Sequence, residues 1–473
     1  MIRTMTQPSE CSALILAAGK GTRMKSRLPK VMQPLLEEPM LYYVLRSLND
    51  AGITDIAVVV GYGGEDVSAW LAKNAPGATV VWQKEQLGTG HAVMAASEWL
   101  RGRSRVLIVN GDMPMVTSDE INDFLAQAEG ADAAFVSCDL DDPAQYGRVV
   151  RYGSNVSIVE ARDATPEQLA LHEVNAGVYL FNVGPLLEGL SHLTCANNQR
   201  EYYIVDLIPW ACAEGLKVLP VKLPAENLAG VNNPLELSRL SLRMRDRILE
   251  RWLLSGVKCV DPSTVWISPR VEFAGEATLY PNVQLWGNTR IGDGCTLESG
   301  TVLRNCVLHD RVRCHNNVVA QDVTAEDDVE MGPFCFVRDG THLLKESFAG
   351  KFVEIKNSTI GERTKVPHLS YMGDAEIGPD TNIGAASVTC NYDGVNKNHT
   401  RIGAHCFVGS DTMFVAPVNV GDRASVGAGS VITDDVPADA LAIARGRQVV
   451  IEGWTRRKHA EQQHAGDDKN TEG

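Results

Sequence analysis

The sequence predicts an α/β protein in which a sheet domain is followed by a linker helix and a parallel β-helix. Short apolar runs alternate with helical patterns in the first half of the chain, and apolar residues recur every six positions in the second half. At 473 residues the chain is too long for one ordinary core. We expect the sheet domain over residues 1–233, the helix over 234–256, the β-helix over 257–454 and a disordered tail over 455–473.

The strands of the sheet domain are predicted from apolar runs that are bounded by Gly or acidic turn residues. These runs are ALILAAG, DIAVVVGYG, ATVVWQ, RVLIVNGD and AAFVSCDL. Alternation of such strands with helices implies a mostly parallel sheet that is covered on both faces. Ligands of parallel sheets bind beyond the carboxyl ends of the strands, so residues that directly follow a strand are the first candidates for a site.

The linker helix is predicted from apolar residues whose spacing of three and four places them on one helical face. These residues are Leu237, Leu240, Met244, Ile248 and Trp252. The same pattern covers only about three heptads, which is short for a coiled coil. We therefore expect a single helix that joins two domains.

The β-helix is predicted from a strict period of six, in which each apolar residue points inward and each repeat forms one side of a coil. The period is seen at Leu279, Leu285, Ile291, Leu297 and Leu303, and again at Ile360, Val366, Ile377 and Ile383. An antiparallel β-sandwich would instead alternate with a period of two. Between Ile383 and Ile402 a polar segment interrupts the period, and we expect this segment to be a loop that leaves the coil.

The charge balance argues against binding of nucleic acid and against insertion into a membrane. The chain has 44 basic and 59 acidic residues, a net charge of −15, and no apolar run near the ~18 residues of a spanning helix. Its 11 cysteines are odd in number and scattered, which argues against a disulfide framework. Because the N-terminus also lacks the features of a signal peptide, we expect a cytoplasmic protein.

A first candidate site follows two of the predicted strands. Gly19 and Gly21 leave room for backbone N–H groups to approach phosphates, and Arg23 and Lys30 add positive charge. Asp112 ends another strand, where a carboxylate is a natural Mg²⁺ ligand beside phosphates. Taken singly, the Gly-rich segment is also compatible with a plain turn, and Asp112 with a helix cap.

A second candidate site gathers at interruptions of the hexapeptide repeat. Lys356, His368 and Tyr371 lie at successive interruptions, although each one alone is also compatible with an ordinary surface residue. The flat wall of a β-helix has no deep cavity, so we expect sites in grooves between subunits or beneath loops that leave the coil.

Several short motifs of the chain together resemble a known family. LAAGKGTRM, QLGTGHA, NGDMP, YGR, EVNAGVY, REYYIVDL and GVNN occur in the order found in sugar-1-phosphate nucleotidyltransferases. With its hexapeptide region, the chain resembles the bacterial bifunctional N-acetylglucosamine-1-phosphate uridyltransferases/glucosamine-1-phosphate acetyltransferases over roughly residues 13 to 455. The resemblance implies a Rossmann-like first domain, a left-handed β-helix, a homotrimer, and UTP, acetyl-coenzyme A and Mg²⁺ as substrates and cofactor.

The resemblance also implies roles for individual residues of the first domain. The nucleotide would be held by Leu16, Ala17, Ala18, Gly19, Lys30, Gln83, Gly88 and Thr89, and the sugar by Gly147, Glu160 and Asn175. Asp112 and Asn232 match the Mg²⁺ ligands. In phosphoryl transfer, Arg23 and Lys30 would offset negative charge on the reacting phosphates. One departure from the family is Asn110, where Tyr is common.

The second domain is covered by the same resemblance. His368 matches the general base, a role that the near-neutral pKa of histidine suits. Glucosamine 1-phosphate would be held by Arg338, Lys356, Tyr371 and Asn382, and acetyl-coenzyme A by Ala385, Asn391, Tyr392, Ser410, Ala428 and Arg445. Two departures are Pro367 and Ala386, where the family commonly has Gly.

Two alternatives remain compatible with the sequence. One is a nucleotidyltransferase of single activity whose β-helix serves only assembly or regulation, and an acetylation assay separates it from the bifunctional enzyme. The other is a hexapeptide scaffold without catalysis. Asp112, Lys30 and His368 in their present contexts argue against the scaffold, which does not require them.

Overall fold

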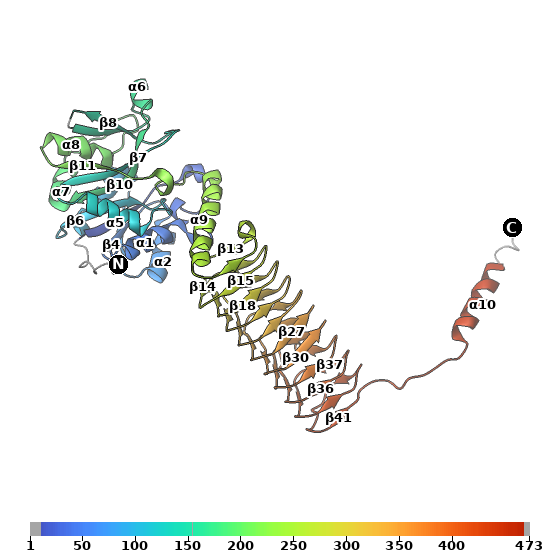
Figure 1. Cartoon of the computed structure of the whole chain (residues 1–473). Helices are drawn as coiled ribbons and strands as arrows, with labels where there is room; N and C mark the ends of the chain where they lie inside the picture. Colours follow the sequence, from blue (N-terminus) through green and yellow to red (C-terminus); the bar gives the residue numbers. More distant parts are fainter. Residues whose placement is uncertain (1–10, 154, 468–473) are drawn as a thin grey trace. The chain divides into compact units, whose positions relative to one another are not determined.

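The structure is a computed structural model that describes residues 11–153 and 155–467 (Figure 1). The described chain divides into two compact units. The first runs up to Glu250 and includes Ile267–Pro269; the second contains Arg251–Trp266 and the residues from Arg270 onward.

A mixed, mostly parallel sheet forms the centre of the first unit. Its strands lie in the order β11 (Val218–Lys222), β7 (Ala133–Asp139), β10 (Glu173–Asn182), β6 (Arg105–Asn110), β1 (Cys11–Ala17), β4 (Ile56–Val60) and β5 (Thr79–Trp82). β10 runs antiparallel to β6 and β7, and the other neighbours in this order are parallel. The five predicted strands are thus confirmed as β1, β4, β5, β6 and β7.

Two short strands and several helices complete this unit. β8 (Arg148–Tyr152) and β9 (Asn155–Val159) pair with each other, and β8 also pairs with β10. β2 (Pro34–Leu35) and β3 (Glu38–Pro39) pair separately. The helices are α1 (Met40–Asp50), α2 (Gly64–Asn74), α3 (Thr89–Ala95), α4 (Ser97–Leu100), α5 (Ser118–Gln127), α6 (Pro166–Leu169), α7 (Val183–Leu190) and α8 (Leu207–Ala213), with 3₁₀ turns η1 (Thr22–Met24), η2 (Lys30–Met32), η3 (Ile204–Asp206) and η4 (Ala225–Asn227).

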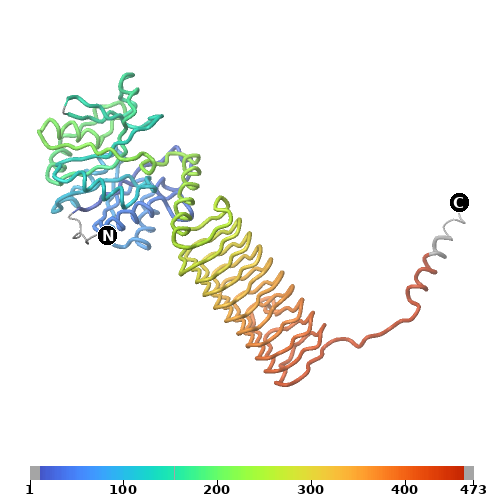
Figure 2. The backbone as a smooth tube through the Cα atoms, viewed as in Figure 1, coloured from blue at the N-terminus to red at the C-terminus, as the bar shows by residue number. Residues whose placement is uncertain are grey.

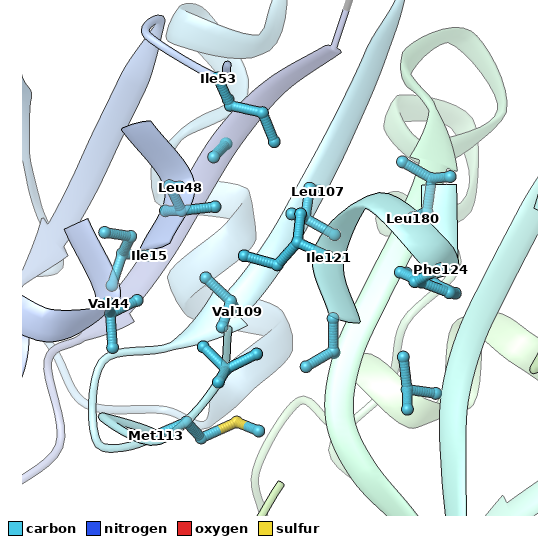
Figure 3. Close-up of a cluster of buried hydrophobic side chains, with 14 of the residues drawn as sticks. Ile15, Val44, Leu48, Ile53, Leu107, Val109, Met113, Ile121, Phe124 and Leu180 are labelled. Atoms are coloured by element: carbon cyan, nitrogen blue, oxygen red, sulfur yellow. The ribbon is translucent and has the colours of Figure 1, made fainter. Parts of the chain in front are cut away.

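Both faces of the sheet are buried, as expected for parallel strands between helices. On one face Ile15 and Val109 pack with Val44 and Leu48 of α1 and with Phe124 of α5 (Figure 3). On the other face Leu14 and Ile108, the neighbours of Ile15 and Val109 in the chain, belong to a second buried cluster with Phe135 and Ile208. Because alternate residues serve opposite faces, the strands are apolar throughout and their carboxyl ends carry the polar residues.

Helix α9 (Pro234–Leu254) covers the segment in which we expected a linker helix, residues 234–256. Leu240, Met244 and Ile248 of the predicted apolar face are buried. The division between the two units falls in the last turn of this helix.

Three parallel sheets wrap around the second unit, and Figure 2 shows its coils stacked one after another. Sheet I contains β12 (Lys258–Cys259), β15 (Ala277–Leu279), β18 (Cys295–Leu297), β21 (Arg313–Cys314), β24 (Glu330–Met331), β27 (Phe348–Lys351), β30 (Lys365–His368), β33 (Asn382–Ile383), β36 (Phe407–Val408), β39 (Ser425–Val426) and β41 (Leu441–Ala442). Sheet II contains β13 (Trp266–Ile267), β16 (Gln284–Trp286), β19 (Val302–Arg304), β22 (Val319–Gln321), β25 (Phe336–Val337), β28 (Glu354–Lys356), β31 (Tyr371–Gly373), β34 (Val388–Cys390), β37 (Met413–Val415) and β40 (Val431–Ile432). Sheet III contains β14 (Glu272–Phe273), β17 (Arg290–Ile291), β20 (Val307–Leu308), β23 (Val323–Ala325), β26 (Thr341–Leu343), β29 (Thr359–Ile360), β32 (Ala375–Ile377), β35 (Thr400–Ile402) and β38 (Val418–Val420).

The predicted left-handed parallel β-helix is confirmed, and its repeat continues where the sequence pattern blurs. Leu279 and Leu297 are fully buried and pair in register across one coil of 18 residues. The next coils, from Leu297 to Cys314 and from Cys314 to Met331, are 17 residues long. Because a 17-residue coil breaks the period of six, and because Cys and Met occupy the inward positions, the apolar pattern is hard to follow there.

The corners between sheets hold residues with positive φ, and each corner has its own chemistry. The corner between sheets II and III carries Gly287, Asn305, Asp322, Gly340, Asn357 and Asp374, and the corner between sheets III and I carries mostly charged residues such as Arg311, Asp328, Arg363 and Asp380. The corner between sheets I and II carries Asn282, Gly300, Asn317, Phe334, Phe352, Leu369, Ala386, Asp411 and Gly429. Three consecutive coils thus place bulky apolar residues at a corner that is elsewhere Asn, Gly, Asp or Ala.

The predicted interruption is confirmed as a loop over residues 391–399, between β34 and β35. The predicted disorder of the tail is not what the described residues show, because helix α10 spans Trp454–Asp467. Ala, Glu, Gln, Lys and Arg favour a helix without tertiary packing, and its side chains up to residue 462 are exposed. Residues 468–473 lie outside the described part.

Two further findings bear on the composition. All eleven cysteines lie among the described residues and are free thiols, which agrees with the expected lack of a disulfide framework. Among the described residues, no helix has both the length and the apolar character needed to cross a membrane.

Ala386 adopts φ = 59° at a corner of the β-helix, a conformation that glycine reaches without a steric penalty. We expect Ala386→Gly to raise the free energy of unfolding of the β-helix unit by about 0.5–1 kcal/mol, measured by urea titration. The neighbouring Ala385 does not have positive φ, so Ala385→Gly should lower the free energy of unfolding by a similar amount. Equal effects of both substitutions would contradict this account.

Candidate active sites

The loop after β1 is held in shape by a glycine and brings two basic residues to the edge of the sheet. Gly21 has φ = 57°, and a Cβ atom there would lie 2.7 Å from the Cβ of Lys30. The loop therefore passes closely over Lys30, which begins η2. The sequence pattern located this loop correctly, but the need for glycine comes from the contact with Lys30.

Lys30, Asp112, Asn232 and Arg23, which we expected at a metal ion and phosphates, form one cluster. The Lys30 ammonium makes an ion pair with Asp112 Oδ2 and donates to Asn232 Oδ1 at 3.0 Å. Arg23 Nη2 donates to the same Asn232 oxygen at 3.1 Å. The side chains of Lys30 and Asp112 are each 17% exposed, so this ion pair is partly shielded from water. The Lys30 ammonium thus contacts both Asp112 Oδ2 and Asn232 Oδ1, the oxygens of the two residues that we expected to bind Mg²⁺.

A cavity of about 500 Å³ extends from this cluster over the ends of β1 and β6. It is lined by every residue expected at the nucleotide: Leu16, Ala17, Ala18, Gly19, Lys30, Gln83, Gly88 and Thr89. Lys20, Val31, Gln86, Ala92, Asn110, Asp112 and Glu201 also line it. The volume lies in the range of small-molecule pockets.

A second cavity of about 220 Å³ lies on the other side of Asp112. The residues expected at the sugar line it, namely Gly147, Glu160 and Asn175, together with Arg23 and Asn232. Thr89, Asn110 and Asp112 line both cavities, so the two spaces meet at the predicted metal ligand. Two ligands that fill these cavities would have their adjoining ends beside Asp112.

Buried side-chain bonds position the wall of the larger cavity. Gln83 is 3% exposed, and its amide Nε2 donates to the carbonyl of Gly88 at 3.0 Å. Gly88 has φ = 102°, and a Cβ atom there would lie 2.6 Å from the carbonyl oxygen of Tyr202. Any other residue at Gly88 would therefore push the segment around Tyr202 away from the cavity.

The smaller cavity has neutral donors and a carboxyl group in a poorly hydrated setting. Asn175 Nδ2 donates to the Tyr179 hydroxyl at 2.6 Å, and its Oδ1 accepts from the backbone N–H of Gly177 at 3.1 Å. Burial, together with the nearby carboxylates of Asp163 and Asp206, raises the pKa of Glu160 above its usual value. Such a group is suited to hydrogen bonding with sugar hydroxyls.

The donor set at Asp112 limits the kind of metal site that this unit can form. Within the described residues, no group of three or more His, Cys, Asp or Glu side chains is arranged to hold a metal ion. One carboxylate and one amide oxygen fit Mg²⁺, which commonly binds one or two protein oxygens and completes its shell with phosphates and water. Asp112 and Asn232 therefore fit a cation that arrives with a phosphorylated substrate.

In the β-helix, the residues expected to bind the amino sugar lie on neighbouring strands of sheets I and II. Lys356 of β28 and Tyr371 of β31 lie on sheet II, with Glu354 opposite Tyr371 in register. Arg338, directly after β25, donates to Glu354 Oε1 at 2.7 Å. His368 and Asn382 lie on β30 and β33 of sheet I, and the ring of His368 is exposed.

The loop over residues 391–399 contacts this group. Asn391 Nδ2 lies 3.4 Å from the Tyr371 hydroxyl, and Tyr392 follows it at the start of the loop. Within the loop, the backbones of Tyr392 and Lys397 pair in an isolated antiparallel β-bridge. The hydrogen bond of Lys356, followed by its charge, lowers the pKa of Lys397, so Lys397 of the loop is a neighbour of Lys356 of the wall.

Sequence reasoning missed Lys397, because it treats the polar segment between Ile383 and Ile402 only as a loop that leaves the coil. The one indication of a role for Lys397 in the sequence was that it is the only Lys or Arg of residues 391–399, at the interruption of a wall that carries Lys356. Two adjacent ammonium groups are unfavourable without an anion between them, so this corner of the wall is suited to a phosphate.

Four of the six residues expected at acetyl-coenzyme A follow the corner between sheets I and II in later coils, whereas Asn391 and Tyr392 lie in the loop after β34. The carbonyl of Ala385 accepts from the backbone N–H of Asp411, the neighbour of Ser410, at 2.7 Å. A Cβ atom on Gly409 would lie 2.4 Å from the backbone nitrogen of Ala428, and Arg445 Nη1 donates to the Ala428 carbonyl at 2.9 Å. Ala385, Ser410, Ala428 and Arg445 are thus stacked along one edge.

Comparison with known proteins finds one family model within each unit. The model for the MobA-like NTP transferase domain matches residues 13–201, and the model for the hexapeptide repeat of succinyl-transferase matches residues 399–434. The chain is 43% identical over 448 residues to the bifunctional protein GlmU of Carboxydothermus hydrogenoformans, covering 94% of this chain and 99% of that protein. It is 45% identical over 451 residues to bifunctional protein GlmU of Thermus thermophilus, covering 95% of this chain and 99% of that protein.

A third relative is the bifunctional protein GlmU of Streptomyces coelicolor, at 41% identity over 455 residues and with 94% of both chains covered. The aligned lengths of the three relatives, 448, 455 and 451 residues, span most of both units. Because the similarity spans both candidate sites and nearly the full length of each relative, the chain belongs to the family of bifunctional GlmU proteins.

Proposed function

We propose that this protein carries out two reactions in the synthesis of UDP-N-acetylglucosamine. The β-helix acetylates glucosamine 1-phosphate with acetyl-coenzyme A, and the sheet domain then transfers UMP from UTP to N-acetylglucosamine 1-phosphate, with release of pyrophosphate. The observation that carries the proposal is the meeting of two cavities at Asp112, beside Lys30, Arg23 and Asn232.

In uridylyl transfer the two reactants are both anions, so the site must position them and offset their charge. The phosphate oxygen of the sugar, in the smaller cavity, attacks the α-phosphorus of UTP in the larger cavity. Lys30 and Arg23 lie where the cavities meet and offset the charge of the reacting phosphates. Asp112 and Asn232 would hold Mg²⁺, which when bound supplies further charge neutralisation at the phosphates.

In acetyl transfer the amine of glucosamine 1-phosphate attacks the thioester carbonyl of acetyl-coenzyme A. His368 takes a proton from the amine, and the thiolate of coenzyme A leaves. Arg338 and Lys356 present positive charge to the phosphate of the sugar, with Lys397 beside Lys356, while Tyr371 and Asn382 orient the sugar. Asn391, which we place at acetyl-coenzyme A, lies 3.4 Å from the Tyr371 hydroxyl. This assignment rests on the family and on the shared location of these residues on sheets I and II.

The alternative of a single-activity nucleotidyltransferase has no separate observation in its favour. An assay that follows label from acetyl-coenzyme A onto glucosamine 1-phosphate separates it from the bifunctional enzyme. The cytoplasmic location stays a prediction from the sequence.

We also propose that the protein is a homotrimer, packed through the apolar corner of the β-helix. Phe334, Phe352 and Leu369 are 52%, 62% and 62% exposed, and the rings of Phe334 and Phe352 stack at 5.4 Å. Bulky residues with positive φ and exposed apolar surface are doubly unfavourable in a monomer, so a partner surface explains their presence. His368 directly precedes Leu369, which places the proposed base beside this contact.

Separate sites predict separate losses of activity. We expect His368→Ala to lower acetylation by roughly 10²–10⁴-fold and to leave uridylyl transfer within about twofold of wild type. Asp112→Ala should have the reverse effect. His405→Ala, at an exposed corner of the same unit, serves as the control. Loss of both activities in either folded variant would contradict two independent sites.

Lys30 competes with a metal ion for the same two oxygens. We expect Lys30→Gln to bind Mn²⁺ roughly tenfold more tightly than wild type without nucleotide, a change of about 1.4 kcal/mol in calorimetric titration. The same variant should lose uridylyl transfer. Lys20→Gln removes one positive charge from the lining of the same cavity, and it therefore controls for the electrostatic effect of losing a positive charge near the metal ion. Equal Mn²⁺ affinities of the two variants would show that Lys30 does not occupy the metal position.

The apolar corner offers a conservative test of assembly, since other coils place Asn at the same corner with the same φ. We expect the double substitution Phe334→Asn and Phe352→Asn to shift the sedimentation coefficient from trimer to monomer and to leave the far-UV spectrum unchanged. Glu346→Asn, at the charged corner, should remain trimeric. A trimer that withstands the double substitution would place the interface elsewhere.

A further inference from the structure

One buried residue, Asp374, holds both ends of the loop over residues 391–399, one through its carboxylate and the other through its backbone carbonyl. Asp374 is 8% exposed and lies in the coil directly before the loop, at the corner between sheets II and III. Its Oδ2 accepts from Asn391 Nδ2 at 2.5 Å, where the chain leaves the coil. Its backbone carbonyl accepts from the N–H of Thr400 at 3.1 Å, where the chain returns. The loop therefore starts and ends on the same residue.

The loop itself is closed by its own bonds and makes a compact hairpin. Asn398 N–H donates to the Asn391 carbonyl at 2.7 Å, and Asp393 Oδ1 accepts from the N–H groups of Val395 and Asn396. These bonds shape the hairpin but do not connect it to the wall. Among the hydrogen bonds of the described residues, the side-chain connection to the wall at Asn391 runs to Asp374 and, more weakly, to the Tyr371 hydroxyl at 3.4 Å.

An internal comparison separates this role from the ordinary role of the corner. Asp322 occupies the same corner three coils earlier, with φ = 52° against 49° for Asp374. Both accept from an Asn at the same corner of the preceding coil, Asn305 to Asp322 at 3.1 Å and Asn357 to Asp374 at 2.6 Å. Both also join the backbones of adjacent coils. The two residues differ at the second carboxylate oxygen: Asp374 Oδ2 accepts from Asn391. They also differ in burial, since Asp322 is exposed.

The position of the loop decides where two groups of the proposed acetyl-transfer site lie. Asn391 reaches the Tyr371 hydroxyl, and Lys397 lies beside Lys356. The negative charge of Asp374 also lies near this lysine pair and opposes its mutual repulsion. If the exit of the loop were released, both groups would move relative to a rigid wall.

We propose that Asp374 is a positioning residue for acetyl transfer, because its carboxylate fixes Asn391 and thereby places the loop that carries Lys397 over the wall. The role rests on the proposed acetyltransferase activity, but the anchoring of the loop is a property of the chain alone. In Asp374→Asn the new amide group faces the N–H of either Asn357 or Asn391, so one of the two side-chain bonds is lost.

The test combines proteolysis with kinetics on the full-length protein. Trypsin cleaves after Lys397, whose following N–H is bonded to Asn391 in the anchored loop. We expect cleavage at Lys397, mapped by mass spectrometry, to be at least about tenfold faster in Asp374→Asn than in wild type. Acetylation should fall roughly 10–100-fold, through higher KM values for acetyl-coenzyme A, which we place at Asn391, and for glucosamine 1-phosphate, whose phosphate faces Lys397, while uridylyl transfer is unchanged. Asp322→Asn should leave all three readouts as in wild type.

Asn391→Ala removes the same bond from the other side and serves if Asp374→Asn does not fold. It should expose Lys397 to trypsin equally, and the double variant should add nothing further. Wild-type cleavage rates in both variants, or equal effects of Asp374→Asn and Asp322→Asn, would overturn the proposal. If wild type does not acetylate glucosamine 1-phosphate, the proposed function fails, and cleavage at Lys397 still decides whether Asp374 anchors the loop.

Discussion

Most corners of the β-helix are closed by a residue with positive φ, and much of the second unit depends on this constraint. Asn, Asp and Gly satisfy it at low energy, and they fill the corner between sheets II and III. The corner between sheets III and I satisfies it with charged residues that pair between coils, for example Arg311 with Asp328 at 2.7 Å. Phe334 and Phe352 adopt positive φ at a conformational penalty and are also exposed. This combination marks their corner as a proposed contact surface.

A different constraint positions the site of the first unit. β1 and β6 are parallel neighbours, so the loop that leads to Lys30 and the turn that carries Asp112 leave the sheet at one edge. β10 runs antiparallel to β6, which brings its beginning, with Asn175, to that same edge. Three strands thus deliver their polar residues to one place, although Lys30 and Asn232 are 202 positions apart in the chain.

Features that depend on local pattern were predictable from the sequence, and features that depend on long-range contact were not. The apolar runs located β1, β4, β5, β6 and β7, and the period of six located the first coils. β10 escaped prediction because its EVNAGVYLFN sequence mixes Asn and Gly with apolar residues. The family motifs located the residues of both cavities, whereas Lys397 became visible only when the folded loop placed it beside Lys356. In the same way, two bonds of Asp374 join it to residues 17 and 26 positions later, a separation that no local pattern reports.

Both proposed reactions bring anions together on a protein whose net charge is −15, so positive charge must be local and held in place. In the first unit Asp112 and Asn232 hold Lys30, and Asn232 holds Arg23, so these cations are positioned before a phosphate arrives. In the second unit Glu354 holds Arg338, but Lys356 and Lys397 face each other. Under the proposed function, the first arrangement would exchange the Lys30 ammonium for a metal ion when substrate binds, whereas the second would gain stability directly from the phosphate. The two sites therefore meet the same electrostatic demand by opposite means: displacement of an internal ion pair in one, and relief of an internal repulsion in the other.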